Sequence, residues 1–255
     1  MKINKASLIC FSPANHTLSI CEQVKEELTV PTVLYDITAF QASCSTTYSK
    51  DELVFFAVPS FGGRVPEIAL EKLKKCKGEQ TPCVLIVTYG NRDYDDTLLE
   101  LKEVVEGCGF ITIGACALIC EHSIMHVFGT DRPDSADRIG ISNFLTQLFV
   151  KLQTTIISPI EVKGNHPYKE YHGIPLKPKV NASCTACGQC SYQCPVQAID
   201  FHHPDTTDTS LCISCMRCIT ICPNHARDVN TLMVKASIMK MKKACSQPKQ
   251  NEFIL

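Results

Sequence analysis

The sequence predicts an α/β fold in which a doubly wound parallel sheet of five strands, in the order 2-1-3-4-5, precedes a small α+β domain. Two observations indicate this fold class. Short apolar runs alternate with helical patterns through residues 1–153, and strands that are apolar on both faces belong to parallel sheets covered by helices on each side. The second observation is a duplicated four-cysteine motif between residues 184 and 223, which predicts a small unit built from two copies.

Apolar periodicity locates the elements of the first part. Near-continuous apolar runs predict strands at 5–11, 32–37, 53–59, 82–89 and 110–120. Apolar residues at helical spacing predict helices at 15–27, 67–77, 94–106 and 135–152. Five strands in a domain of about 150 residues match the order 2-1-3-4-5. A sheet of this kind binds ligands beyond the carboxyl ends of its strands, where the strand order reverses.

Changes in composition divide the chain into four segments. Residues 1–153 form the first domain, with the parallel sheet. Residues 154–180 hold four prolines and two glycines without a sustained period, which predicts an extended tether that wraps along the first domain. Residues 181–227 form a cysteine-rich domain. Residues 228–255 form a C-terminal helix, predicted at 229–244, and a tail; the lysines of this helix predict a solvated basic face.

The cysteine-rich domain contains the pattern C-x2-C-x2-C-x3-C-P twice, with an offset of 28 residues. Bacterial ferredoxins hold 4Fe-4S clusters with this pattern, and its fourth cysteine binds the other cluster. We therefore expect one cluster on Cys184, Cys187, Cys190 and Cys222, and a second on Cys212, Cys215, Cys218 and Cys194. Zinc sites usually show two ligand pairs separated by a longer spacer, so zinc and a disulfide framework are the weaker alternatives.

Composition and charge exclude several classes of protein. A net charge of −1 indicates neither nucleic-acid nor membrane binding. The longest apolar run, 110–120, is too short to cross a bilayer, and the N-terminal apolar stretch is too short for a signal peptide. Eight of the 17 cysteines lie in the motifs, and the others are expected to be reduced thiols in a cytoplasmic protein. A homodimer is compatible with the sequence.

Three loops follow the strands at the reversal point. The first, Ser12–Thr17, leads into a helix whose free N–H groups suit a phosphate monoester. The second, Pro59–Pro66, has paired glycines that let the backbone approach a flat ligand. The third, Thr88–Tyr94, places aromatic residues on both sides of a glycine turn. After the fifth strand, Cys120 and Glu121–Ser123 are expected to have no chemical role, because polar residues at strand ends are common and Cys120 ends an apolar run.

Together these loops resemble the flavodoxin family, and the cysteine motifs behind them make the chain similar to the bacterial flavodoxin–ferredoxin fusion proteins. The resemblance implies a flavodoxin-like first domain that binds FMN. It implies that Ser12 and Thr17 hold the phosphate, that Phe61–Gly63 and Tyr89–Tyr94 flank the ring, and that Arg64 or Arg92 offsets the charge of a reduced flavin. The full set of expected FMN-binding residues is Ser12, Asn15, His16, Thr17, Pro59, Ser60, Phe61, Gly62, Gly63, Thr88, Tyr89, Gly90, Asn91, Arg92 and Tyr94.

The first loop departs from the flavodoxin pattern. Flavodoxins usually read Ser/Thr-x-Thr-Gly-x-Thr there, whereas Ala14 replaces a hydroxyl residue and Asn15 replaces the glycine. Asparagine tolerates left-handed backbone better than most residues. The chain also has no tryptophan, so stacking on a flavin depends on tyrosine or phenylalanine. The alternative is a flavodoxin-like scaffold that has lost FMN.

The function predicted from these features is electron transfer between two 4Fe-4S clusters, FMN and external redox proteins. An electron carrier is favoured over a catalyst with its own substrate, because no convincing proton donor is visible in the sequence. The alternatives are an oxidoreductase whose flavin reduces a small acceptor with electrons from the clusters, and a flavin-free docking domain that carries a ferredoxin.

Overall fold

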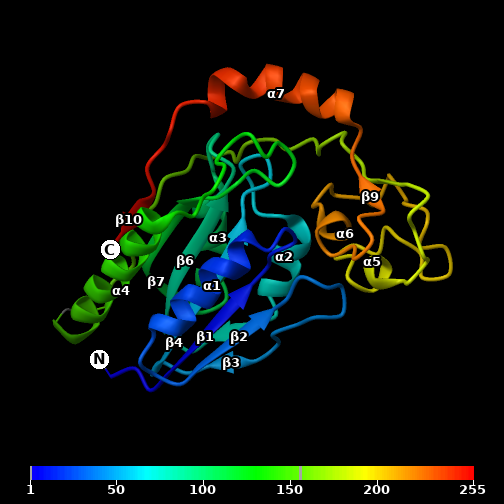
Figure 1. The fold of residues 1–255 in the computed structure, drawn as a ribbon. Coiled ribbons are helices and arrows are strands. Elements are labelled where there is room, and N and C mark those ends of the chain that lie inside the picture. Colours follow the sequence, from blue (N-terminus) through cyan, green and yellow to red (C-terminus); the bar gives the residue numbers. More distant parts are fainter. Residues whose placement is uncertain (1, 155–156) are drawn as a thin grey trace.

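The computed structural model describes residues 2–154 and 157–255, and its central feature is a six-stranded sheet between two layers of helices (Figure 1). Five of the strands are parallel. From one edge of the sheet across, they are β2 (Thr32–Asp36), β1 (Lys5–Cys10), β4 (Glu52–Pro59), β6 (Thr81–Tyr89) and β7 (Phe110–Ile119). Numbered along the chain, this is the order 2-1-3-4-5, so the predicted doubly wound sheet is confirmed.

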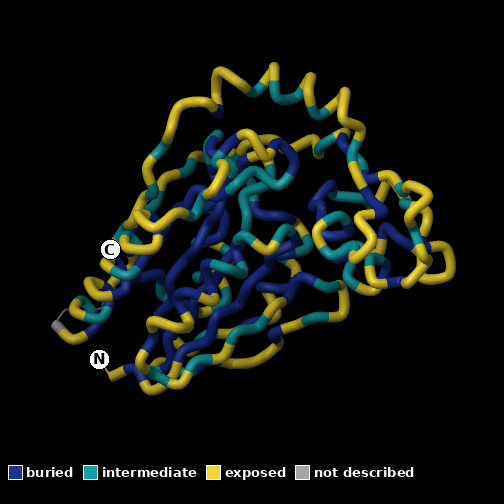
Figure 2. Tube along the Cα trace, in the orientation of Figure 1, coloured by how far each residue is buried: buried dark blue, intermediate teal, exposed yellow. Residues whose placement is uncertain are grey.

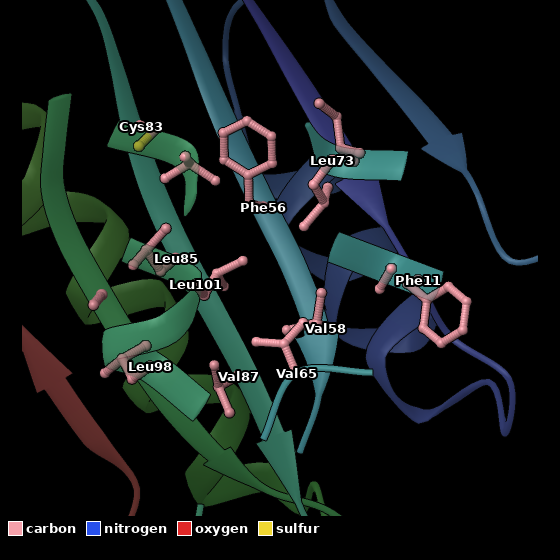
Figure 3. Close-up of a cluster of buried hydrophobic side chains, with 14 of the residues drawn as sticks. Phe11, Phe56, Val58, Val65, Leu73, Cys83, Leu85, Val87, Leu98 and Leu101 are labelled. Atoms are coloured by element: carbon pink, nitrogen blue, oxygen red, sulfur yellow. The ribbon is translucent and has the colours of Figure 1, made fainter. Parts of the chain in front are cut away.

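Alternate residues of each strand enter two separate cores. Leu8 and Cys10 of β1 pack under α1 (His16–Glu27) and α4 (Ser135–Thr154) on one face. Ile9 and the following Phe11 pack under α2 (Glu67–Leu73) and α3 (Thr97–Glu106) on the other. Figure 3 shows this second core, where Leu98 and Leu101 lie over Leu85 and Val87. The four inner parallel strands β1, β4, β6 and β7 are therefore apolar on both faces and almost entirely buried (Figure 2), whereas the edge strand β2 is partly exposed.

A sixth strand comes from the end of the chain and was not expected from the sequence. The strand β10 (Glu252–Ile254) pairs antiparallel with β7, with Phe253 opposite Cys116. The ring of Phe253 packs against Phe144 of α4, with centroids 5.6 Å apart. Three residues are too few to give a periodic signal, although their pairing covers an otherwise open sheet edge.

Residues of the segment between the two domains pack along the first domain. Ile160 is buried in the core under α2 and α3, and its N–H donates to the carbonyl of Thr112 at 2.9 Å. Further on, the Asp96 carboxylate accepts hydrogen bonds from the backbone N–H groups of Asn165 and Lys169, at 2.8 and 2.6 Å. Residue 1 of the predicted first domain and residues 155 and 156 of the predicted tether lie outside the described residues.

The cysteine-rich domain is small and α+β. It contains β8 (Lys179–Val180) paired antiparallel with β9 (Arg227–Asp228), and two short helices, α5 (Gln189–Tyr192) and α6 (Arg217–Thr220). The first domain adds a two-stranded sheet of β3 (Thr47–Tyr48) and β5 (Lys77–Gly78). Helix α2 ends at Leu73, earlier than the sequence predicted, and Lys77 of the predicted helix belongs to β5 instead.

The last helix, α7 (Thr231–Cys245), crosses from the cysteine-rich domain back to the first domain (Figure 1). The side chain of Asn230 caps it by accepting from the N–H groups of Leu232 and Met233. Its inner face joins a third core, made of residues from every segment of the chain: Ile124, Met125, Phe128, Leu176, Met216, Val234, Ile238, Met241 and Cys245. This core fixes the cysteine-rich domain against the first domain. Within the described part of the chain, no helix has the length and apolar character needed to cross a membrane.

Candidate functional site

The eight motif cysteines surround two cavities of equal size. The first cysteine cavity is lined by Cys184, Cys187, Cys190 and Cys222. The second cysteine cavity is lined by Cys194, Cys212, Cys215 and Cys218. Each has an empty volume of about 330 Å³. In each set three cysteines come from one copy of the motif and the fourth comes from the other copy, which is the arrangement that the sequence predicts.

The two copies share an unusual backbone as well as a sequence pattern. Three pairs of equivalent residues have positive φ in both copies: Ala186 (53°) and Ser214 (56°), Gly188 (76°) and Met216 (63°), and Gln197 (53°) and His225 (48°). Five of these six residues carry a Cβ, for which this conformation is unfavourable. The duplication therefore preserves a strained loop shape that wraps each cysteine triplet around its cavity.

Backbone N–H groups point at the cysteine sulfurs in the same way in both copies. The N–H of Ala198 donates to Cys194 Sγ at 3.3 Å, and the equivalent N–H of Ala226 donates to Cys222 Sγ at 3.2 Å. In the second copy, the N–H of Ser214 also donates to Cys212 Sγ at 3.4 Å. Donors of this kind stabilise thiolates that bind iron.

The cysteines fit a cluster better than a single ion. A tetrahedral zinc ion draws its thiolates to about 2.3 Å. Among the residues that the structure describes, no three histidine, cysteine, aspartate or glutamate side chains converge closely enough to share one ion. Each set instead lines one cavity, with the four thiols around a common space, as the four corners of a cubane require. Burial raises the pKa of the Cys194 and Cys215 thiols, and raises that of Cys218 to about 12, so metal binding must drive their deprotonation.

The two cysteine cavities differ in exposure. Cys187 in the first is exposed, and its three partners are partly exposed. In the second, Cys194, Cys215 and Cys218 are buried, and only Cys212 is partly exposed. The first cysteine cavity therefore faces solvent, whereas the second faces the first domain.

A larger cavity lies at the carboxyl ends of the strands, as expected for a doubly wound sheet. It has an empty volume of about 680 Å³. Ten of the fifteen expected residues line it: Ser12, His16, Thr17, Pro59, Ser60, Phe61, Gly62, Thr88, Tyr89 and Gly90. All three loops at the reversal point thus contribute to one cavity, which we call the large cavity.

The first loop is held in place by hydroxyl groups. The N–H of Ser12 donates to Thr38 Oγ1 at 2.7 Å, and Ser12 Oγ accepts from the N–H of Leu18 at 2.9 Å. The hydroxyls of Thr17 and Thr88 share a hydrogen bond of 2.8 Å that joins the first loop to the third. Helix α1 begins at His16 in the cavity wall, where the first N–H groups of a helix have no intrahelical partner. The loop therefore presents hydroxyl and N–H donors, the groups that bind a phosphate.

The remaining five expected residues do not line the large cavity. Three of them belong to the third loop and have other contacts. Asn91 donates to the carbonyls of Cys245 and Gln247, and Arg92 pairs with Asp95. Tyr94 is 1% exposed, and its ring packs on Tyr89 at 5.5 Å. Asn91, Arg92 and Tyr94 therefore lie outside the wall of the large cavity, and Asn91 and Tyr94 contact the C-terminal segment instead.

Gly63 and Asn15 also have other contacts. A Cβ on Gly63, which has φ of 94°, would collide with Asp95, so the glycine allows the second and third loops to approach each other. Asn15 has φ of 66°, the left-handed backbone that the flavodoxin pattern assigns to a glycine. Its side-chain oxygen accepts a hydrogen bond from Arg217 of the cysteine-rich domain at 2.9 Å.

Neither Arg64 nor Arg92, the arginines expected to offset the charge of a reduced flavin, lines the large cavity. Arg64 pairs with the buried carboxylate of Glu100 and lies over the ring of Tyr168 at 4.8 Å. Glu100 is 3% exposed, and such a buried negative charge needs a cationic partner. Within the described residues, no lysine or arginine lines the large cavity.

The loop after β7 lines the large cavity, although it was expected to have no role. The lining includes Cys120, Glu121, His122, Ser123 and Ile124. His122 Nδ1 accepts from the N–H groups of Ile124 and Met125, at 3.1 and 3.2 Å, so the neutral ring carries its proton on Nε2. Burial lowers the pKa of His122 to about 4, helped by His126 and His16. The rule that places ligands beyond strand ends applies to β7 too, and it could have identified this loop.

The cysteine-rich domain and the tether complete the large cavity. Ile174, Ser214 and Cys215 lie in its wall. Ser214 Oγ donates to the carbonyl of Ile174 at 2.9 Å, which joins the two contributions. Cys215 also lines the second cysteine cavity. No pattern in the sequence indicates this contact, because it depends on how the two domains pack.

Comparisons with known proteins match part of the cysteine-rich domain to a known family. Residues 206–228 match the family model of the 4Fe-4S binding domain. No curated protein matches the chain. Similar solved structures include a flavodoxin from Streptococcus pneumoniae TIGR4, with 13% identity, a TM-score of 0.42 and coverage of 58% of this chain and 99% of that one. Another is a putative flavoprotein from Bacteroides uniformis ATCC 8492, with 12% identity, a TM-score of 0.38 and coverage of 57% and 99%.

The family match and the strand order identify the two parts of the chain. The match covers the second cysteine triplet, and 4Fe-4S domains carry single electrons. The parallel order 2-1-3-4-5 is that of the flavodoxin-like fold. The chain therefore joins a flavodoxin-like domain to a 4Fe-4S binding domain, which is the arrangement of the flavodoxin–ferredoxin fusion proteins that its sequence resembles.

Proposed function

We propose that the chain is an electron-transfer protein that holds two 4Fe-4S clusters in the cysteine cavities and FMN in the large cavity, and that exchanges electrons with external redox proteins. When bound, the clusters carry one electron each and FMN carries one or two, so the chain would convert between one-electron and two-electron traffic. The observation that carries the proposal is the position of Cys215, which lies in the walls of both the second cysteine cavity and the large cavity.

The crossed cysteine sets support two clusters. Each cavity is surrounded by four thiols, three from one copy of the motif and one from the other. The equal cavity volumes, the repeated φ angles and the repeated N–H contacts to sulfur support the same cofactor in both. The match at residues 206–228 covers only part of this arrangement, so the second cluster depends on the duplication.

Two groups of residues in the wall of the large cavity support FMN as its ligand. Ser12, His16 and Thr17 supply hydroxyl and N–H donors for a phosphate. Phe61 and Tyr89 supply aromatic surface, and Gly62 and Gly90 lie in the same walls. A Cβ on Gly90 would collide with His122, so this glycine allows the loop after β7 to close on the cavity.

The two cysteine cavities differ in exposure, and this difference suggests a route for electrons through the chain. The first cysteine cavity, with the exposed Cys187, is accessible to an external redox protein. The second is buried against the large cavity. We therefore propose that electrons pass between partner and FMN through the two clusters in turn.

Anaerobic reconstitution tests this function. The full chain is supplied with iron, sulfide and FMN, and its iron and sulfide content, absorbance spectrum and EPR spectrum after dithionite are measured. The expected result is two cubanes and one flavin per chain. Iron content near zero would contradict the proposal, and a protein with two clusters but no flavin absorbance would favour the flavin-free docking domain.

A second candidate function is a flavin-dependent reductase of a small acceptor. It is favoured by Glu121, His122 and Ser123 in the wall of the large cavity, because polar groups there could orient an acceptor. The low pKa of His122 makes it a fixed hydrogen-bond donor rather than an acid at neutral pH. Turnover with a panel of small acceptors separates the two functions, since an electron carrier reduces only redox proteins and dyes.

A further inference from the structure

Arg217 is a buried cation between the second cysteine cavity and the first loop of the large cavity. The residue is 8% exposed and lies between Cys215 and Cys218 in the sequence. Its Nη1 donates to Asn15 Oδ1 at 2.9 Å, and its Nη2 donates to Gln193 Oε1 at 2.8 Å. These two hydrogen bonds, with an ion pair of 3.8 Å between Nη2 and Asp36 Oδ2, fix the guanidinium against both domains.

The remaining donor of this side chain, the Nε–H group, has no hydrogen-bond partner in the part of the protein that the structure describes. Among the described residues, Arg217 Nε is one of four buried side-chain nitrogen or oxygen atoms without a hydrogen-bond partner. Such donors are rare, because the protein must compensate for the lost contact with water. Arg217 lines the second cysteine cavity, where thiolate and sulfide sulfurs would be the available acceptors.

We infer that the Nε–H group of Arg217 donates to a sulfur of the cluster held by Cys194, Cys212, Cys215 and Cys218, and that it raises the reduction potential of that cluster. The inference rests on the proposed function. Reduction adds one electron, and therefore one negative charge, to a site with little water. A hydrogen bond to sulfur and a nearby cation both stabilise the reduced form.

The first copy of the motif has no arginine at the equivalent position. The residue equivalent to Arg217 is Gln189, which is uncharged and exposed. The first cysteine cavity does have a buried arginine in its wall, Arg227. Its Nη1 donates to Thr207 Oγ1 at 2.8 Å, and its Nη2 donates to the carbonyls of Pro204 and Thr206. Arg227 therefore holds a protein loop, whereas Arg217 has a buried donor left for the cavity.

The contact with Asn15 links this effect to the packing of the domains. Asn15 belongs to the loop that would hold the phosphate of FMN, and it is 202 positions from Arg217. Because Asn15 fixes one end of the guanidinium, the position of Nε relative to the cluster depends on the first domain. The structure thus assigns Arg217 as a positioning residue that favours an electron on the cluster beside the large cavity.

Redox titration of the reconstituted full chain, followed by EPR, tests the inference. The wild type is compared with Arg217→Gln, which has the residue of the first copy. The expected result is that one of the two midpoint potentials falls by at least 59 mV, which is a tenfold change in the one-electron equilibrium, while the other is unchanged. Gln189→Arg is the matched control, and solvent screening should leave both potentials within that limit.

Two further variants separate the contact from a general loss of structure. Arg217→Lys retains the charge without the Nε–H group, and Asn15→Ala removes the anchor on the first domain; each should shift the same potential by less than Arg217→Gln. If Arg217→Gln does not retain both clusters, the inference is tested on Arg217→Lys alone. A midpoint potential equal to that of the wild type in Arg217→Lys then overturns the inference.

The outcomes distinguish this inference from the proposed function. Two one-electron signals whose potentials are unchanged in Arg217→Gln, or shifted equally, overturn the inference alone. A wild-type protein without two such signals overturns the proposed function, and the inference with it.

Discussion

The hydroxyl of Tyr94 donates a hydrogen bond of 2.6 Å to the carboxylate of Glu252, 158 positions further along the chain. Burial raises the pKa of this tyrosine, and the bond to Glu252 raises it further. Glu252 begins β10, so the contact joins the loop after β6 to the strand that closes the sheet edge. Asn91 donates to the carbonyls of Cys245, the last residue of α7, and Gln247. With these contacts, the third loop anchors the end of the chain.

Tyr94→Phe should therefore affect stability and leave flavin binding unchanged. The ring remains packed on Tyr89, but the hydrogen bond to Glu252 is lost, so the free energy of unfolding should fall by about 1 kcal/mol. Chemical denaturation and FMN titration measure the two effects. Tyr192→Phe is the control, because Tyr192 is 65% exposed. A tenfold loss of FMN affinity in Tyr94→Phe would show that this ring does contact the flavin.

Asp96 holds the tether to the first domain, and Asp96→Asn should release it. The carboxylate is buried and accepts two backbone N–H groups of the tether. Because these bonds are made to a charged acceptor, the expected loss is about 2 to 3 kcal/mol in the free energy of unfolding. Limited proteolysis should also cut the tether faster. The exposed Asp131→Asn serves as control, and equal cleavage rates in the two variants would contradict this role.

His122 should make stability depend on pH. Its pKa of about 4 lies below the ordinary value of 6.5, so the unfolded chain binds more protons between these values. The stabilisation is complete above pH 6.5 and is lost as the pH falls toward 4, by about 2 kcal/mol between pH 7 and pH 5. His122→Asn keeps an acceptor for the two N–H groups without titrating.

Urea denaturation of the cluster-free protein at both pH values measures the effect. His16 and His126, which lie close enough to influence His122, are present in both proteins and cancel in the comparison. The wild type should lose about 2 kcal/mol more than His122→Asn. Equal losses in the two proteins would mean that His122 titrates normally in the folded state.

Much of this architecture was predictable because it depends on local pattern. The five parallel strands follow from runs such as residues 82–89, which are apolar at nearly every position and so must be buried on both faces. The cysteine sets follow from spacing, because a triplet of cysteines two residues apart has few ways to enclose a cluster. The ten cavity-lining residues follow from the topological rule for strand ends.

The rest depends on contacts between segments that are far apart in the sequence. The sequence suggests that Tyr94 stacks on a ligand, because its hydrogen bond to Glu252 joins two distant segments and leaves no local pattern. Strand β10 has only three residues, which is too few to show a period. In the sequence, Arg217 is simply a residue between two cluster-binding cysteines, and its contact with Asn15 is visible only in the folded chain. These positions are set by tertiary packing, for which a single sequence carries no pattern.

The central claim is that electrons reach the large cavity through the second cysteine cavity. A direct test is the rate at which a reduced two-cluster ferredoxin reduces FMN in the full chain, because a folded protein donor cannot enter the large cavity itself. The wild type is compared with Cys194→Ser, which alters the second cysteine cavity, and Cys222→Ser, which alters the first.

Cluster content is measured in each variant, so that the rate is assigned to the cluster that remains. The account predicts that Cys194→Ser slows flavin reduction at least tenfold, even where the first cluster is retained and reduced by the donor. Flavin reduction at the wild-type rate in Cys194→Ser would contradict it.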